Sequence, residues 1–176
     1  AKAAEMKDKG EIEENLDTRR DFDTTQTFPN GCHIAEVEVE PETGEVSVVG
    51  YYAVDDCGVM LDHTLVHGQV QGGIAQGLGQ VLLENAVYAP DSGQFVTGSF
   101  MDYAMPRAGD LGDIAVESHP VPTKTNPLGV KGAGEAGCVG ALPAVANALV
   151  DALAEFGVRH IEMPATPERV WRAMTG

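Results

Sequence analysis

Three observations predict an α+β domain with a mixed sheet built from hairpins, packed by a long glycine-rich helix and a buried C-terminal helix. Valines alternate with glutamates over residues 36–48, which is typical of strands with one wet face. Apolar residues recur at helical spacing over residues 63–85 and again over 142–156. Because hairpins open the domain, an α+β fold is favoured over repeated βαβ units.

The composition is that of a globular domain, because the 176 residues are 43% hydrophobic and 22% charged. A net charge of −16 argues against binding to nucleic acid or to an anionic membrane surface, both of which require basic patches. No apolar run approaches the roughly 20 residues that span a bilayer. Cys32, Cys57 and Cys138 stand far apart without a CxxC pair, so we expect a reducing, cytoplasmic setting.

Residues 1–27 predict a charged N-terminal arm, and residues 28–176 predict one domain. The arm contains helix formers up to Leu16 but few apolar residues, so we expect a marginal helix or a disordered lead-in. Beyond it, the turn at 41–45 joins two alternating strands into an antiparallel hairpin. The apolar phase slips after Gly50, which predicts a bulge there.

Asp62 is the candidate N-cap of a helix over residues 63–85. Glycines stand inside that helix at 68, 72, 73, 77 and 79, and each costs about 1 kcal/mol relative to alanine. Two explanations remain open: a cofactor presses against the glycine face, or a neighbouring helix packs tightly onto it. His63 and His67 have the spacing of zinc ligands, but no third ligand is evident, so we predict no metal site.

The remaining elements are predicted from turn residues and apolar periodicity. In order, they are a hairpin over 87–97, a strand over 114–117, an extended proline-rich segment over 120–127, a helix over 142–156 and a short terminal helix over 168–174. Pro143 is expected in the first turn of its helix, where proline is tolerated, and Gly157 is expected to close the other end.

A glycine-spaced loop, residues 131–137, carries one lysine and one glutamate just before the 142–156 helix. Its backbone is free to approach a ligand closely, and the N–H groups at the start of the helix suit an anion such as phosphate. The surrounding chain predicts that Glu135 is buried. A carboxylate shielded from water binds a proton more tightly, as a general base near neutral pH requires. The alternative is a plain connection in which Glu135 merely caps the helix.

Two further motifs near this loop stay ambiguous. The spacing G-x-G-x-x-G at 132–137 is a weak dinucleotide signal, because no strand of a βαβ unit precedes it. Cys57 lies in a turn before the glycine-rich helix, and it is either a reactive thiol or a buried, inert one.

Five stretches together resemble the C-terminal part of the molybdopterin-binding large subunit of the xanthine oxidase and aerobic carbon monoxide dehydrogenase (molybdenum hydroxylase) family. They follow the family's order from about Thr27 to the end of the chain, and the last two are the most specific. The stretches are 31–39, 55–58, 68–77, 126–135 and 166–171.

The resemblance implies part of the catalytic subunit of a molybdopterin-dependent oxidoreductase, which oxidises an aldehyde, a heterocycle or a similar small substrate with a water-derived oxygen. Glu135 would be its general base, and no residue is implied as a metal ligand. The implied cofactor is molybdopterin carrying molybdenum, in the cytosine dinucleotide form. The residues implied to bind it are Cys57, Gly58, Gln69, Val130, Lys131, Gly132, Ala133 and Gly134.

The family's large subunit is several times longer than this chain, so the resemblance implies a cut fragment or a naturally split piece that is inactive alone. The implied partners are the rest of the subunit, an iron–sulfur subunit and an FAD-containing flavin subunit. The alternative is a non-catalytic assembly or nucleotide-binding module with the same fold.

Overall fold

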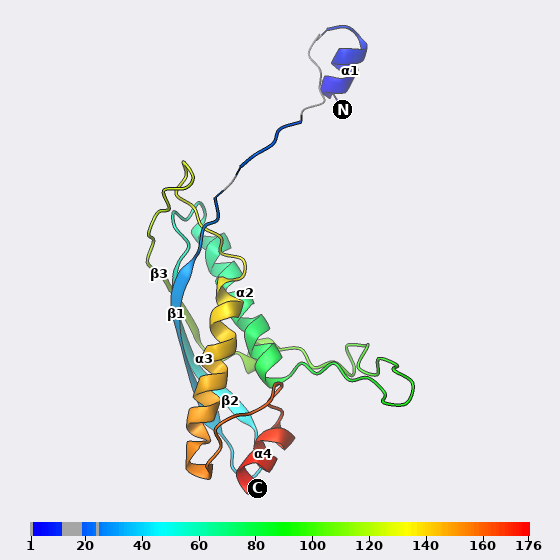
Figure 1. Ribbon diagram of the computed structural model, residues 1–176, viewed down its shortest axis with the longest axis vertical. Helices are drawn as coiled ribbons and strands as arrows, with labels where there is room; N and C mark the ends of the chain where they lie inside the picture. The colour runs from blue at the N-terminus through cyan, green and yellow to red at the C-terminus, as the bar shows by residue number, and fades with distance from the viewer. Residues whose placement is uncertain (1, 12–18, 24) are drawn as a thin grey trace.

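The computed structural model describes residues 2–11, 19–23 and 25–176. It has the predicted α+β architecture, with a mixed sheet covered on one face by helices (Figure 1). The elements are α1 (Lys2–Asp8), β1 (Asn30–Val39), β2 (Val46–Asp56), α2 (His63–Leu82), η1 (Ala108–Asp110), β3 (Ile114–Ser118), α3 (Ala136–Ala152), η2 (Ala154–Phe156) and α4 (Pro167–Thr175).

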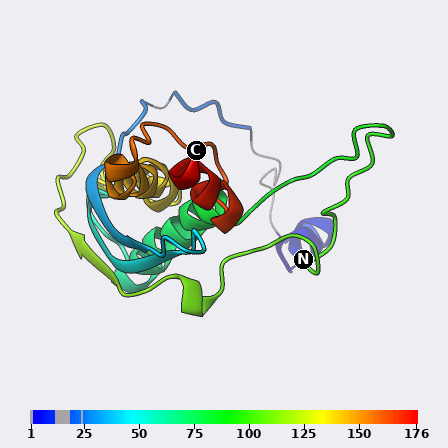
Figure 2. The same ribbon diagram turned by 90° about the horizontal axis from the view of Figure 1, so that it is seen from below.

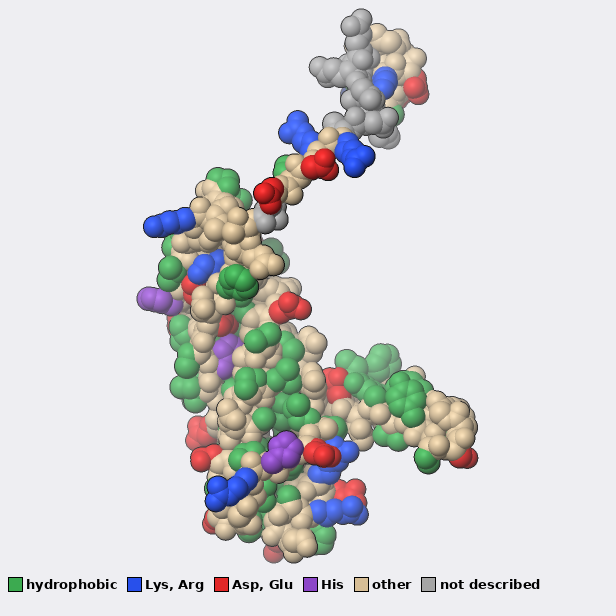
Figure 3. All heavy atoms as spheres, viewed as in Figure 1, with side chains coloured by type: hydrophobic (Ala, Val, Ile, Leu, Met, Phe, Trp, Pro, Cys, Tyr) green, Lys and Arg blue, Asp and Glu red, His purple; other side chains and the backbone are tan. Residues whose placement is uncertain are grey.

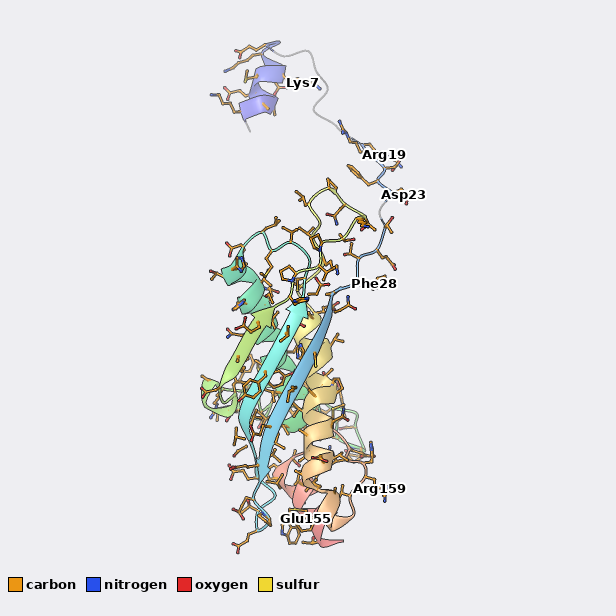
Figure 4. The ribbon with its side chains drawn as sticks, turned by 90° about the vertical axis from the view of Figure 1, so that its left-hand side faces the viewer. Lys7, Arg19, Asp23, Phe28, Glu155 and Arg159 are labelled. Atoms are coloured by element: carbon orange, nitrogen blue, oxygen red, sulfur yellow. The ribbon has the colours of Figure 1, made fainter. Side chains whose placement is uncertain are left out.

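The sheet has the order β1-β2-β3, and it is open and mixed. The β1–β2 pair is the predicted antiparallel hairpin, whereas β3 joins β2 in parallel after a long excursion of the chain. The pairing skips Val49 next to Gly50, opposite Glu36 and Val37, which confirms the bulge expected there. Figure 4 shows the three strands side by side with α3 behind them.

The two long helices share one core with the sheet. Helix α3 packs against both α2 and β1, and Figure 2 shows both helices inside the curve of the sheet. The buried residues of α3 recur every four positions, at Gly137, Ala141, Val145 and Leu149, so one stripe faces inward. From the sheet, Tyr51 and Ala53 complete this core.

The glycines of α2 have two different surroundings. A Cβ on Gly73 would stand 2.8 Å from the backbone nitrogen of Cys138, and one on Gly77 would stand 2.6 Å from the Cβ of Ala141. Close packing against α3 therefore explains these two positions. Gly68 and Gly72 have nothing within 4 Å of an added Cβ, so helix packing does not explain them.

Helix α3 begins at Ala136, earlier than the residue 142 that the periodicity predicted. The prediction for Pro143 was wrong for the same reason, because this proline lies inside the helix and not in its first turn. Gly137 and Cys138, which read as loop residues, become helical because they fit closely against α2. A Cβ on Gly137 would lie 2.2 Å from the carbonyl oxygen of Val70.

Residues 86–106 form a projecting arm between α2 and η1, drawn in green in Figure 1. Of the hairpin predicted over 87–97, all of whose residues are described, the structure contains an isolated bridge between Tyr88 and Phe95, but neither of the two strands. Hydrophobic side chains cover much of this arm in Figure 3. Phe100 and Met101 are 86% and 92% exposed.

Both ends of the chain carry a short helix. Helix α1 has no buried residue, and residues 1, 12–18 and 24 of the N-terminal arm predicted over 1–27 lie outside the described part. The terminal helix α4 forms as predicted, with Val170 buried in the core. Within the described residues, no helix has the length and hydropathy needed to cross a membrane.

Candidate functional site

Asp56, the last residue of β2, fixes the segment that leads into the glycine loop. One carboxylate oxygen, Oδ1, accepts hydrogen bonds from the backbone N–H groups of Gly58 and Val121, both at 2.9 Å. The other, Oδ2, pairs with the ammonium of Lys131. Burial by itself would raise the pKa of Asp56, but the bonds from Lys131, Val121 and Gly58 lower that pKa below its ordinary value. Asp56 is therefore a charged anchor that accepts from three donors, namely two backbone N–H groups and one ammonium.

Backbone pairing adds to this anchor. The N–H of Lys131 donates to the carbonyl of Cys57 at 3.0 Å, and the N–H of Val59 donates to the carbonyl of Gly129 at 3.0 Å. Gly58 has a φ of +66°, and a Cβ on it would lie 2.3 Å from the oxygen of Gly129, so this position requires glycine. The turn after β2 and the 121–131 segment thus form one rigid unit.

The glycine loop touches α2 at Gln69. The Oε1 atom of Gln69 lies 3.6 Å from where a Cβ on Gly134 would stand. Gly68 flanks this glutamine, and Gly72 follows one helical turn later, both exposed and open. None of the described residues therefore covers the backbone of α2 at Gly68 and Gly72, beside the loop.

Glu135 occupies the N-cap position of α3, but its side chain makes no capping hydrogen bond. The capping role considered for Glu135 is therefore wrong in this structure. The expected burial is also absent, because Glu135 is exposed in this chain. The result is a carboxylate at the start of a long helix that is not engaged by its own backbone.

Glu135 lines a hollow of about 570 Å³ between the glycine loop and the start of β1. The loop and α3 contribute Gly132, Gly134, Glu135, Ala136, Val139 and Gly140. The opposite wall is formed by Thr27, Pro29, Asn30, Gly31, His33 and Asp55. Phe28, labelled in Figure 4, marks this end of the sheet.

A buried polar chain forms the wall of the hollow on the sheet side. The ring of His33 contacts the hydroxyl of Tyr51 through Nδ1 at 2.7 Å and Oδ1 of Asp55 through Nε2 at 3.2 Å. Burial, and after it the charge of Asp55, raises the pKa of Tyr51, so the phenol keeps its proton. Each donor has an acceptor when the Tyr51 hydroxyl donates to Nδ1 and the Nε2–H group donates to Asp55.

Other candidate chemistry is absent or disfavoured. Burial, followed by the charges of Asp55 and Asp56, raises the pKa of the Cys57 thiol, which favours the inert reading of this cysteine. Among the described residues, no group of three or more His, Cys, Asp or Glu side chains could hold a metal ion, so His63 and His67 gain no third ligand.

The structure brings the predicted site residues together around the glycine loop, but in different roles. Gly132, Gly134 and Glu135 line the hollow. Backbone pairing and an ion pair fix the position of the loop. The pairing joins Cys57 to Lys131 and Gly58 to Val130, and the ion pair joins Lys131 to Asp56. Ala133 accepts the N–H of Ala136 at 3.3 Å as the helix begins, and Gln69 contributes from α2.

Sequence reasoning missed His33 and Asp55 and gave Asp56 no role. The available signal was the pair of consecutive acids that ends an otherwise apolar strand. Charged residues are rarely buried unless they are paired, so two of them at the end of a core strand mark a polar site. His33 gave no local signal, because its partners are distant in the chain.

Comparison with known proteins identifies the family. A family model described as the molybdopterin cofactor-binding domain matches residues 2–112. The nicotine 6-hydroxylase large subunit of Paenarthrobacter nicotinovorans is 41% identical over 94% of this chain and 20% of its own length. The carbon monoxide dehydrogenase large chain of Hydrogenophaga pseudoflava is 32% identical over 84% of this chain and 18% of its own length.

The fold is also similar to that of a solved structure. The quinoline 2-oxidoreductase of Pseudomonas putida 86 superposes with a TM-score of 0.78 at 42% identity, covering 81% of this chain and 18% of that one. The chain thus spans about a fifth of the length of the relatives it matches. Because the family model matches more than half of the residues, this chain belongs to the molybdopterin cofactor-binding domain family.

Proposed function

We propose that this chain is part of the catalytic subunit of a molybdenum hydroxylase, in which Glu135 is the general base and the glycine loop forms part of the molybdopterin site. The single observation that carries this proposal is that the carboxylate of Glu135 is free of bonds to its own helix and lines the hollow. Glu135 is held on a loop that other residues fix in place.

A general base must reach a proton on the reacting group, so its own lone pairs must be free. The Asp56–Lys131 pair and the backbone bonds around Gly58 fix the loop, which limits the positions that the Glu135 carboxylate can take. Such pre-organisation lowers the cost of reaching a reactive geometry. Glu135 would bind the proton at its carboxylate and so favour attack by the oxygen that loses it.

The residues present fit a pterin cofactor beside this loop. Gly68 and Gly72 leave the α2 backbone open on either side of Gln69, so a planar group could approach where a Cβ would otherwise stand. Gln69 and the exposed backbone at Gly132 and Gly134 would hold it by hydrogen bonds. When bound, the molybdenum cofactor would supply the two-electron redox chemistry of the reaction.

We place this chain within a larger assembly, consisting of the remainder of the large subunit with iron–sulfur and flavin subunits, in the cytoplasm. The surface supports an assembly, because large apolar side chains are exposed on the projecting arm and on the outer face of the sheet. On that face, Ile34, Tyr52 and Val54 are 60%, 52% and 44% exposed. One relative is named as subunit gamma of a complex.

The relatives are named for compounds as different as nicotine and carbon monoxide, so the substrate does not follow from family membership. The proposal therefore extends to a small molecule oxidised with a water-derived oxygen, and the cofactor is proposed in its cytosine dinucleotide form. Acid release of one cytidine nucleotide per molybdenum from the assembled enzyme would support that form, and release of none would contradict it.

The decisive experiment replaces Glu135 with glutamine in the assembled enzyme. Loss of a general base lowers kcat by about 10²–10⁴-fold, and we expect the molybdenum content to stay unchanged because glutamine keeps the size of the side chain. The control is Glu155→Gln, an exposed glutamate at the opposite end of the molecule (Figure 4). Unchanged turnover in E135Q would favour a non-catalytic assembly module instead.

A second measurement tests the need for the rest of the subunit. We expect this chain, purified alone, to hold far less than one molybdenum per chain, because the open backbone beside Gln69 covers only one side of a bound pterin. Nearly stoichiometric metal in the isolated chain would contradict this expectation.

A further inference from the structure

One carboxylate oxygen in the wall of the hollow is buried without a hydrogen-bond partner. Asp55 is 4% exposed, and its Oδ2 atom has no partner among the described residues. An unsatisfied buried acceptor costs about 1–3 kcal/mol, and more when it is charged. Such a group needs a physical explanation, and a partner from outside the chain is one that the structure can be tested for.

His33, the side chain bonded to Asp55, cannot satisfy this oxygen as well. The Nε2–H group of His33 is used on Oδ1, and the other ring nitrogen of His33 is engaged by Tyr51. The ring has no room to turn, because His33 lies against α3. A Cβ on Gly140 would stand 2.5 Å from the ring.

The hollow gives access to this wall. Asp55 is among its lining residues, and Gly31 leaves room for the carboxylate at this wall, since a Cβ there would lie 1.9 Å from Oδ1. A volume of about 570 Å³ far exceeds the roughly 30 Å³ that one water occupies. A ligand that displaces water from this wall must therefore bring its own donor, or the unpaired oxygen opposes its binding.

The charge of the hollow selects the kind of donor. Asp55 and Glu135 both line it, and none of the described lining residues is a lysine or an arginine. Lys131, the nearest cation in the loop, is committed to Asp56. Two carboxylates without a free cation oppose an anionic ligand and favour a neutral or cationic one. A metal ion is a poor match, because the described residues offer no set of three ligands.

We propose that Asp55, oriented by His33, is a binding site for the N–H donor of a neutral or cationic nitrogen compound in the hollow. The donor bonds to Oδ2 while Oδ1 stays bonded to the ring of His33. The inference rests on the proposed function only in placing this ligand beside Glu135, and it holds for a substrate or for the amino group of a cofactor ring.

The test is direct binding to the full 176-residue chain with three planar probes of nearly equal shape. Benzamidine is a cationic N–H donor, benzamide is a neutral N–H donor, and benzoate is an anion with no donor. We expect saturable binding of benzamidine, weaker binding of benzamide and no competition by benzoate. Asp55→Asn should weaken benzamidine binding by about 10- to 100-fold, as expected when a hydrogen bond to a charged group is lost.

The matched control is Glu117→Gln, which removes an exposed carboxylate from β3 and should leave the affinity unchanged. Equal binding to D55N and wild type would overturn the proposal. Failure of benzamidine to bind, or equal binding of benzoate, would overturn it as well. If D55N does not fold, binding can be followed in the wild-type chain by NMR of the histidine ring nitrogens. Benzamidine should shift the signals of His33 and leave those of the exposed His63 in place.

Failure here is distinguishable from failure of the proposed function. In the assembled enzyme, a 2-aminopteridine and a nitrogen-containing substrate can each compete with benzamidine, and the effective competitor identifies the source of the donor. Loss of benzamidine binding in D55N with full turnover in E135Q would retain this site and reject the catalytic role of Glu135. The converse pair of results would retain the base and reject this site.

Discussion

Asp55 and Asp56 are neighbours at the end of one strand, yet their surroundings are opposite. Successive residues of a strand point to opposite faces, so Asp55 faces the hollow while Asp56 faces the segment before the glycine loop. Asp56 satisfies three donors of its own chain, including the ammonium of Lys131. Asp55 has one partner and an unpaired oxygen. A fully satisfied carboxylate stabilises the fold, whereas a half-satisfied one is available to a ligand.

The largest effect should follow from removing the satisfied carboxylate. Asp56→Leu leaves the Lys131 ammonium and two backbone N–H groups without their acceptor. We expect a loss of about 3 kcal/mol in the free energy of unfolding, the lower end for a broken buried ion pair, because both side chains retain about a tenth of their exposure. Urea denaturation of wild type and D56L would measure it, and a loss below about 1 kcal/mol would show that this anchor is not structural.

A smaller loss should follow from crowding the unsatisfied carboxylate. A Cβ at Gly31 would overlap Oδ1 of Asp55, so Gly31→Ala forces that side chain to move. Overpacking of this kind costs about 1–3 kcal/mol. The control is Gly68→Ala, at an open position inside α2, which should gain up to about 1 kcal/mol. Equal melting temperatures for the two variants would contradict the close approach at Gly31.

The pH dependence of stability tests the anchoring role of Asp56. The pKa of Asp56 is lowered in the folded chain, so its contribution is complete above the unfolded value near 3.9 and disappears as the pH falls through the lower folded value. We therefore expect wild type to lose stability below about pH 4 more steeply than Asp56→Asn does. Parallel curves from acid titrations followed by circular dichroism would contradict this linkage.

The smallest effect on folding is expected at Asp55 itself. Asp55→Asn keeps an oxygen for His33 and removes a buried charge with one unsatisfied atom. The weaker bond and the relieved charge act in opposite directions, so we expect the free energy of unfolding to change by less than about 1 kcal/mol. Denaturation of D55N beside D56L would check the contrast, and a similar loss in both would mean that Asp55 is a structural residue.

Much of this structure could be predicted from local patterns. Alternating valines and glutamates predicted the hairpin, and the slip of the apolar phase after Gly50 predicted the bulge. Asp62 was correctly expected to cap α2, where it accepts the N–H of Leu65 at 3.0 Å. The glycine loop before a long helix was evident as well. These features depend on contacts close in sequence, which periodicity and capping rules describe.

The early start of α3, the packing of Gly73 and Gly77 and the buried chain from Tyr51 through His33 to Asp55 depended on the tertiary structure. Each involves partners from different elements, such as α3 against α2 or β1 against β2. Glu135 shows the same limit: the sequence singled out its loop, but only the fold determined that this carboxylate is exposed beside a hollow. Burial and hydrogen-bond satisfaction are properties of the assembled neighbours, so no local pattern could decide them.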